Sequence, residues 1–181
     1  MTDTIRGLSR SHVWDYENGF YWFSHNSRLN KMLAHYELYK TITSIPGHIF
    51  ELGVYKGASL IRFCAFRDAL ENDFSRKIIG FDAFGEFPTD NLEVQDDLAF
   101  IERFEGEGGH GLGEEEVENV LLSKGFENFK LIKGNVFDTI PKYLSKNPAT
   151  RIALLHLDMD VKEPTDFALE LLYERMVPGG I

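Results

Sequence analysis

The segment with the clearest chemical meaning is ELGVYKGAS at positions 51–59, in which an apolar stretch runs into two glycines. Gly53 and Gly57 would let the backbone approach a ligand closely, and the amino end of a helix after them would offer free N–H groups to an anion. The segment is not the dinucleotide-binding fingerprint, because Tyr55 stands where that motif requires its second glycine. Spacing alone leaves both a cofactor loop and an ordinary tight turn open.

Two later segments would complete a nucleoside site. Asp82 ends an apolar stretch, and a carboxylate there can accept hydrogen bonds from both hydroxyls of a ribose. The alternative for Asp82 is a helix cap or a solvated side chain. Asn135, Val136 and Phe137 could offer backbone contacts and an apolar surface to an adenine. The alternative for that segment is a plain strand-to-helix turn with Asp138 as its N-cap.

Asp158 and Asp160 are two carboxylates at the end of another apolar stretch. Such a pair can hold one Mg²⁺ together with waters and substrate oxygens, and the metal would lower the pKa of a bound hydroxyl. The alternative is a solvated loop pair. His156, just before them in the apolar stretch, is expected to be a core histidine with satisfied hydrogen bonds.

These residues need a scaffold that brings their segments together, and the hydrophobic pattern predicts one. The expected strands are 48–52, 77–81, 129–133 and 151–157, and the expected helices are 27–42, 59–72, 92–104, 114–123 and one from 163. Ser27 is the expected cap of the first of these helices. Strands that alternate with helices favour an α/β fold with a Rossmann-like, doubly wound parallel sheet. Ligands of such sheets bind at the carboxyl ends of the strands.

The formal net charge of −10 is concentrated in one part of the 181-residue chain. Between Glu86 and Glu118 there are twelve acidic residues and one basic residue, Arg103, whereas the remainder is close to neutral. The same segment holds five glycines between positions 106 and 113, and glycine-dense sequence is costly to order. We expect residues 84–124 to be an acidic, mobile lid over the strand ends.

The composition also excludes some classes of partner. Nucleic acids and anionic membranes both attract clustered Lys and Arg side chains, which an acidic protein of this kind does not offer. No apolar stretch approaches the roughly 20 residues of a membrane span, and the opening residues do not resemble a signal peptide. We therefore expect a cytoplasmic protein. The single cysteine, Cys64, lies in an apolar helical pattern and is expected to be an inert core thiol.

Four motifs in order carry a resemblance to a known family: ELGVYKGAS, GFDAFGEFP, KGNVFDTIP and LHLDMDVKEPT, followed by MVPGG. Together they resemble the class I S-adenosylmethionine-dependent methyltransferases. More narrowly, the chain is similar to the macrocin O-methyltransferase family, which methylates deoxysugar hydroxyls on antibiotics and related glycosides. The pattern ELGxYxGxS also resembles catechol O-methyltransferase. The match covers about residues 46–180 and implies S-adenosylmethionine and Mg²⁺ as cofactors.

The resemblance implies a role for each matching residue. The cofactor positions are Glu51, Gly53, Tyr55, Gly57 and Ser59 near the methionine part, Asp82 at the ribose, and Asn135, Val136 and Phe137 near the adenine. Asp158 matches the first carboxylate of the metal site and is the implied catalytic residue, with Asp160 as the nearby acid. The aspartate and Mg²⁺ would activate the acceptor hydroxyl, so the main tasks of the protein are alignment and electrostatics.

The sequence departs from the family pattern after the PGG turn, where the family continues with a strand ending in an acidic pair and with further strands. This sequence ends at Ile181, so we expect a carboxyl-terminal truncation or a fragment that another chain completes. The expected parts are an aromatic arm and helix at 1–45 and an incomplete S-adenosylmethionine-binding domain at 46–181. The expected acceptor is a small-molecule hydroxyl on a sugar or glycoside. A catechol or other phenol as acceptor, a non-catalytic cofactor-binding fragment and a homo-oligomer stay open.

Overall fold

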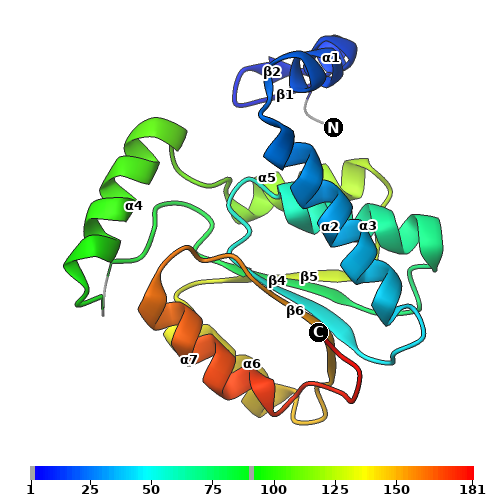
Figure 1. Ribbon diagram of the computed structural model, residues 1–181, viewed down its shortest axis with the longest axis vertical. Coiled ribbons are helices and arrows are strands. Elements are labelled where there is room, and N and C mark those ends of the chain that lie inside the picture. The colour runs from blue at the N-terminus through cyan, green and yellow to red at the C-terminus, as the bar shows by residue number, and fades with distance from the viewer. Residues whose placement is uncertain (1–2, 90–91) are drawn as a thin grey trace.

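A computed structural model describes residues 3–89 and 92–181 and shows a parallel sheet with helices on both faces (Figure 1). The strands of the sheet are β3 (His48–Leu52), β4 (Ile78–Asp82), β5 (Phe129–Lys133) and β6 (Ile152–Leu157). Their spatial order is β5-β4-β3-β6, and each neighbouring pair is parallel. The predicted α/β, doubly wound fold is therefore confirmed, with each strand within one residue of its expected position.

The core lies in two layers, one on each face of the sheet. Helices α2 (Asn26–Ile42), α3 (Ala58–Leu70) and α5 (Glu114–Ser123) cover one face, and helices α6 (Val136–Lys146) and α7 (Lys162–Tyr173) cover the other (Figure 1). Successive side chains of a strand point to opposite faces, so Ile49 packs in the first layer and Phe50 in the second. Among the described helices, none is long and apolar enough to cross a membrane.

The amino-terminal arm consists of β1 (Thr4–Ile5), β2 (Leu8–Ser9), the short 3₁₀ helix η1 (Arg10–His12) and α1 (Val13–Phe23). It lies beyond the amino end of α2 (Figure 1), and no residue of α1 is buried. Arg6 connects this arm to α5, because its guanidinium donates hydrogen bonds to the Glu116 carboxylate at 3.1 Å. The aromatic side chains of α1 thus remain largely in solvent.

The acidic segment divides into two parts in the structure. Helix α4 (Gln95–Gly108) extends beyond the edge of the sheet, whereas α5 packs on it and buries Val117 and Leu121 in the core (Figure 1). Asp90 and Asn91 of this segment lie outside the described residues. The mobile lid stays a prediction, and the burial of α5 restricts it to the part before α5.

The predicted cap at Ser27 is wrong, and the alternative cap at Asp138 is not observed either. The N-cap of α2 is His25, whose Nδ1 accepts a hydrogen bond from the Ser27 amide at 3.2 Å. The N-cap of α6 is Asn135, whose side-chain oxygen accepts from the Phe137 amide at 3.1 Å, while Asp138 lies inside the first turn. In both cases the helix begins earlier than expected, because the N-cap is the residue whose side chain reaches a free amide of the first turn.

Candidate functional site

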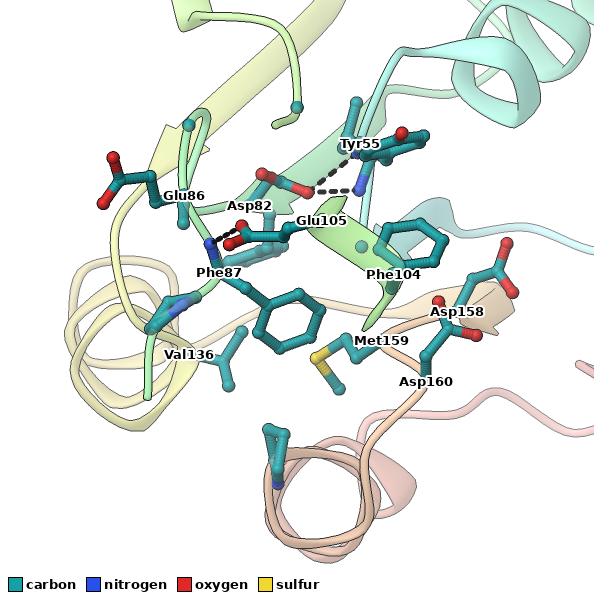
Figure 2. A pocket seen from close by; sticks show the side chains of 18 of the residues that line it. Tyr55, Asp82, Glu86, Phe87, Phe104, Glu105, Val136, Asp158, Met159 and Asp160 are labelled. Atoms are coloured by element: carbon teal, nitrogen blue, oxygen red, sulfur yellow. Dashed lines mark hydrogen bonds between the residues drawn. The ribbon is translucent and has the colours of Figure 1, made fainter. Parts of the chain in front are cut away.

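A cavity of about 340 Å³ opens at the carboxyl ends of the four strands (Figure 2). Its volume falls within the range of roughly 300–1,000 Å³ that small-molecule sites occupy. The predicted site residues that line it are Gly53, Tyr55, Ser59, Asp82, Asn135, Val136, Phe137, Asp158 and Asp160. Glu51 and Gly57 are not among the lining residues. The fold therefore gathers most of the predicted constellation around one pocket.

The turn after β3 depends on glycine. Gly53 has a φ of 92°, and a Cβ on it would lie 2.2 Å from the backbone oxygen of Asp158. Only a residue without a side chain fits this close approach between the ends of β3 and β6. Gly57, with a φ of 77°, is the N-cap of α3 and so lets the chain enter that helix. Gly57 thus shapes the loop from behind the pocket wall.

Asp82 holds this turn against the end of β4. Its Oδ2 accepts hydrogen bonds from the amides of Val54 at 2.7 Å and Tyr55 at 2.9 Å (Figure 2). Its Oδ1 accepts from the Phe84 amide at 2.6 Å. A carboxylate oxygen has about two lone-pair sites, so Oδ2 is saturated and Oδ1 retains one site for a ligand. The side chain that the sequence suggested for a ribose therefore also organises the loop.

Glu51 lies behind the pocket wall rather than in it. Its side chain is 0% exposed, and its Oε1 is 3.4 Å from Nδ1 of His156. Burial raises the pKa of the Glu51 carboxyl, and His156 opposes that shift. Neither the Glu51 carboxylate nor His156 Nδ1 has a hydrogen-bond partner within the described part of the chain. The expectation that His156 is a fully satisfied core histidine is therefore wrong.

The adenine side of the predicted site follows β5. Asn135 caps α6, Val136 is buried, and the Phe137 ring packs on Phe167 with 4.8 Å between ring centroids. In Figure 2, the Phe87 and Val136 side chains both line this part of the pocket. This corner has apolar side chains and backbone groups from a helix start, which suit a flat aromatic ligand.

Asp158 and Asp160 lie at the other end of the pocket, after β6 (Figure 2). Asp158 Oδ2 accepts a hydrogen bond from the Lys31 ammonium at 2.8 Å, which makes a partly exposed ion pair. Asp160 has a φ of 63°, and burial followed by the Asp158 charge raises its pKa. The Asp160 carboxylate therefore lies close enough to Asp158 to be affected by its charge.

This carboxylate pair fits the donor set of Mg²⁺, which often takes one or two carboxylates and completes its shell with waters and substrate oxygens. Within residues 3–89 and 92–181 there is no group of three or more His, Cys, Asp or Glu side chains placed to hold a metal. Asp158 and Asp160 would thus be the protein's own contribution to such a site.

Part of the acidic segment lines the pocket, through Phe104, Glu105, Gly109 and Gly111. The Tyr55 hydroxyl donates hydrogen bonds to the carbonyls of Gly108 at 2.7 Å and Gly109 at 3.1 Å. Glu105 accepts a hydrogen bond from the Phe87 amide at 2.7 Å (Figure 2). The backbone carbonyls of the glycine-rich stretch therefore attach it to the turn after β3, through contacts that no local pattern indicates.

Several lining residues were missed by sequence reasoning. They are Arg28, Lys31, Arg62, Phe87, Phe104, Glu105 and Met159. The basic residues carried a weak signal, since Arg28 and Lys31 are three residues apart and so share a helix face. The aromatic residues Phe87 and Phe104 had none, because an apolar side chain is more often part of the core than of a binding site.

Comparison with solved structures gives the same fold. The crystal structure of CalS11, a calicheamicin methyltransferase, matches with a TM-score of 0.64 and 27% identity over 95% of this chain and 70% of that one. An apo structure of CalS11, described as a TDP-rhamnose 3'-O-methyltransferase, matches with a TM-score of 0.62, 28% identity and coverage of 95% and 69%. The O-methyltransferase NovP has a TM-score of 0.67 with 22% identity, over 81% of this chain and 60% of NovP, and supports the fold alone.

Sequence comparison identifies a curated relative from Streptomyces olivaceus, 8-demethyl-8-(2,3-dimethoxy-alpha-L-rhamnosyl)-tetracenomycin-C 4'-O-methyltransferase. It is 31% identical over 142 residues, which are 75% of this chain. The chain spans about half the length of that relative, 51%. The family model for macrocin O-methyltransferase (TylF) matches residues 10–181. The chain therefore belongs to the macrocin O-methyltransferase family.

Proposed function

We propose that this protein binds S-adenosylmethionine and, with Mg²⁺, takes part in methylating a hydroxyl of a sugar or glycosylated small molecule. The observation that carries the proposal is the arrangement of one pocket. Asp82 and Asn135 line the side that follows β4 and β5, and Asp158 and Asp160 line the side that follows β6. A nucleoside on the first side would direct the rest of the cofactor toward the two carboxylates.

Each side of the pocket has a separate task in this proposal. Asp82 would accept a ribose hydroxyl through the free site on Oδ1, while Val136 and Phe137 would cover the adenine. When bound, the cofactor supplies an electrophilic methyl group, and Mg²⁺ supplies a positive charge that lowers the pKa of the acceptor hydroxyl.

The remaining work falls to the residues after β6. Asp158 and Asp160 would hold the metal, and Asp158 would orient the acceptor hydroxyl and favour loss of its proton. The Lys31 ammonium donates a hydrogen bond to Asp158 Oδ2 at 2.8 Å and so restrains the orientation of that carboxylate. Alignment of the hydroxyl with the methyl group would provide most of the acceleration, since methyl transfer needs little further chemistry from the protein.

The family and the relatives' substrates support the acceptor class. The name of the curated relative gives a rhamnosyl compound as its substrate, and the description of one CalS11 structure gives TDP-rhamnose. Both substrates contain a sugar. A soluble sugar or glycoside is therefore the proposed acceptor for this chain, in a cytoplasmic setting. A catechol acceptor, a non-catalytic cofactor-binding role and homo-oligomer formation remain the alternatives to be tested.

Calorimetry with S-adenosylhomocysteine, followed by mass spectrometry of acceptors incubated with S-adenosylmethionine and Mg²⁺, tests the proposal. We expect binding, and a product heavier by one methylene unit with sugar or glycoside acceptors but not with catechols. Asp158→Asn should retain nucleoside binding and lose product, whereas the exposed Asp68→Asn should retain both. Absence of nucleoside binding would contradict the cofactor assignment. Binding with no product from any acceptor would favour the non-catalytic role.

A further inference from the structure

Two arginines line the pocket without a use in the function described above. Arg28 lies in the first turn of α2 and is exposed, and Arg62 lies in α3, one turn after Ser59, and is half-buried. Neither guanidinium makes a hydrogen bond or an ion pair with any residue in the ranges 3–89 and 92–181. Both therefore offer their N–H groups to whatever enters the pocket.

Their charges are close enough to affect each other. Burial, and after it the Arg28 charge, lowers the pKa of Arg62, while the charge of Glu51 opposes the shift. Glu51 is sealed in the core and makes no hydrogen bond to either arginine. Repulsion between two cations at a pocket wall lowers the stability of the folded chain, and an anion bound between them would relieve that repulsion.

Other buried or half-buried arginines of the chain are engaged. Arg67 donates to the carbonyls of Arg76 and Asn128 and pairs with Asp73, and Arg76 pairs with Glu71 at 2.8 Å. Lys31, next to Arg28 on α2, is neutralised by Asp158. The positive charge at this wall therefore belongs to Arg28 and Arg62, in a chain whose net charge is −10.

We propose that Arg28 and Arg62 form an anion subsite that binds a carboxylate or phosphate group of a pocket ligand. The planar guanidinium presents paired donors that match the oxygens of both groups. This inference rests on the proposed function, because it assigns the subsite to a ligand of the same pocket.

The order of the strands in the sheet indicates at which end of the pocket the subsite lies. Asn135 follows β5 at one end of the order β5-β4-β3-β6, and Asp158 follows β6 at the other. Lys31 joins α2 to Asp158, which follows β6, so Arg28 on the same helix lies toward the β6 end of the pocket. Two ligand groups could reach it: the amino-acid carboxylate of the cofactor, or a phosphate of a nucleotide-linked sugar acceptor.

Titration calorimetry with three probes separates these sources. S-adenosylhomocysteine carries the carboxylate, methylthioadenosine lacks it, and inorganic pyrophosphate represents the phosphates of the acceptor. The variants are Arg28→Met and Arg62→Met, with Lys142→Met as the control for net charge, since Lys142 is exposed on α6 and outside the pocket. Arg62→Lys keeps the charge without the paired donors and covers the case in which Arg62→Met fails to fold.

We expect each arginine variant to weaken one probe by roughly tenfold or more and to leave methylthioadenosine unchanged. Loss of S-adenosylhomocysteine affinity identifies the cofactor carboxylate as the occupant, and loss confined to pyrophosphate identifies an acceptor phosphate. If both probes bind the arginine variants as tightly as they bind Lys142→Met, the subsite is refuted. Failure of methylthioadenosine to bind the unaltered chain would instead count against the proposed cofactor, and the pyrophosphate titration would still test the subsite.

Discussion

The Asp82 carboxylate accepts a hydrogen bond from the backbone amide of Tyr55 at 2.9 Å and so ties the end of β4 to the turn after β3. The same oxygen accepts from the Val54 amide, which makes one side chain the partner of two consecutive N–H groups. The two segments are 27 residues apart in sequence. The shape of the predicted cofactor loop therefore depends on a residue outside that loop.

Asp82→Asn should loosen this loop. The substitution removes the negative charge and places either an NH₂ donor or a weaker oxygen acceptor opposite the Val54 and Tyr55 amides. We therefore expect the free energy of unfolding to fall by about 1–3 kcal/mol. Affinity for S-adenosylhomocysteine should fall by roughly tenfold or more. Chemical denaturation and calorimetry measure the two effects. Asp138→Asn, exposed on α6, is the control, and an Asp82 variant that behaves like it would contradict the role of Asp82.

Leu121 and Leu122 provide a matched test of which part of the acidic segment belongs to the core. Leu121 is 0% exposed and Leu122 is 54% exposed, although they are neighbours on α5. Leu121→Ala should cost about 2–5 kcal/mol of unfolding free energy, because it leaves a cavity. Leu122→Ala should cost less than about 0.5 kcal/mol. Equal losses in denaturant titrations would mean that α5 does not pack on the sheet.

Tyr55→Phe should release the glycine-rich stretch, because the hydroxyl that donates to the Gly108 and Gly109 carbonyls is removed. Limited proteolysis followed by mass spectrometry should then show faster cleavage between Glu105 and Glu114. Tyr173→Phe is the control, since Tyr173 is exposed and distant from that stretch in the sequence. Unchanged cleavage in Tyr55→Phe would show that other contacts hold the segment.

Lys31→Met should tighten the binding of a divalent cation. The Lys31 ammonium donates a hydrogen bond to Asp158 Oδ2 at 2.8 Å and places a positive charge beside the proposed metal site. Removal of the Lys31 charge therefore frees one carboxylate oxygen for the metal. We expect a gain of roughly threefold to tenfold in Mn²⁺ affinity, read by calorimetry or by electron paramagnetic resonance. Asp158→Asn should weaken the same binding. A loss of affinity in Lys31→Met would exclude competition between Lys31 and the metal.

Cys64 should be unreactive while the chain is folded. Its side chain is 0% exposed, and burial raises the pKa of the thiol to about 12. At about pH 8 the Cys64 side chain is therefore almost entirely in the unreactive thiol form. A colorimetric thiol reagent at that pH should react with it only as fast as the protein unfolds. Reaction in denaturant is the positive control. Fast labelling of the native chain would show that the α3 layer opens readily.

Much of the scaffold was predictable because its signals are local. The apolar stretch at 48–52 and the glycines after it coincide with β3 and its turn, and the stretch at 129–133 coincides with β5. The predicted cap at Ser27 was wrong and the alternative cap at Asp138 is not observed, since a cap depends on which side chain reaches which amide. The burial of α5 was hidden by its three leading glutamates, which dominate the composition of that helix.

The sequence by itself determined the class of sheet, the edge at which a ligand would bind and the residue types available there. Those properties follow from hydrophobic periodicity and from the rule that parallel strands end at one edge. Only the tertiary structure decided which side chains share that edge. Lys31 reaches Asp158 across 127 residues, Arg28 and Arg62 line one pocket from two helices, and Glu51 lies behind the wall rather than in it. Such contacts depend on strand order and on how two helices pack, and neither is written in the pattern of any single segment.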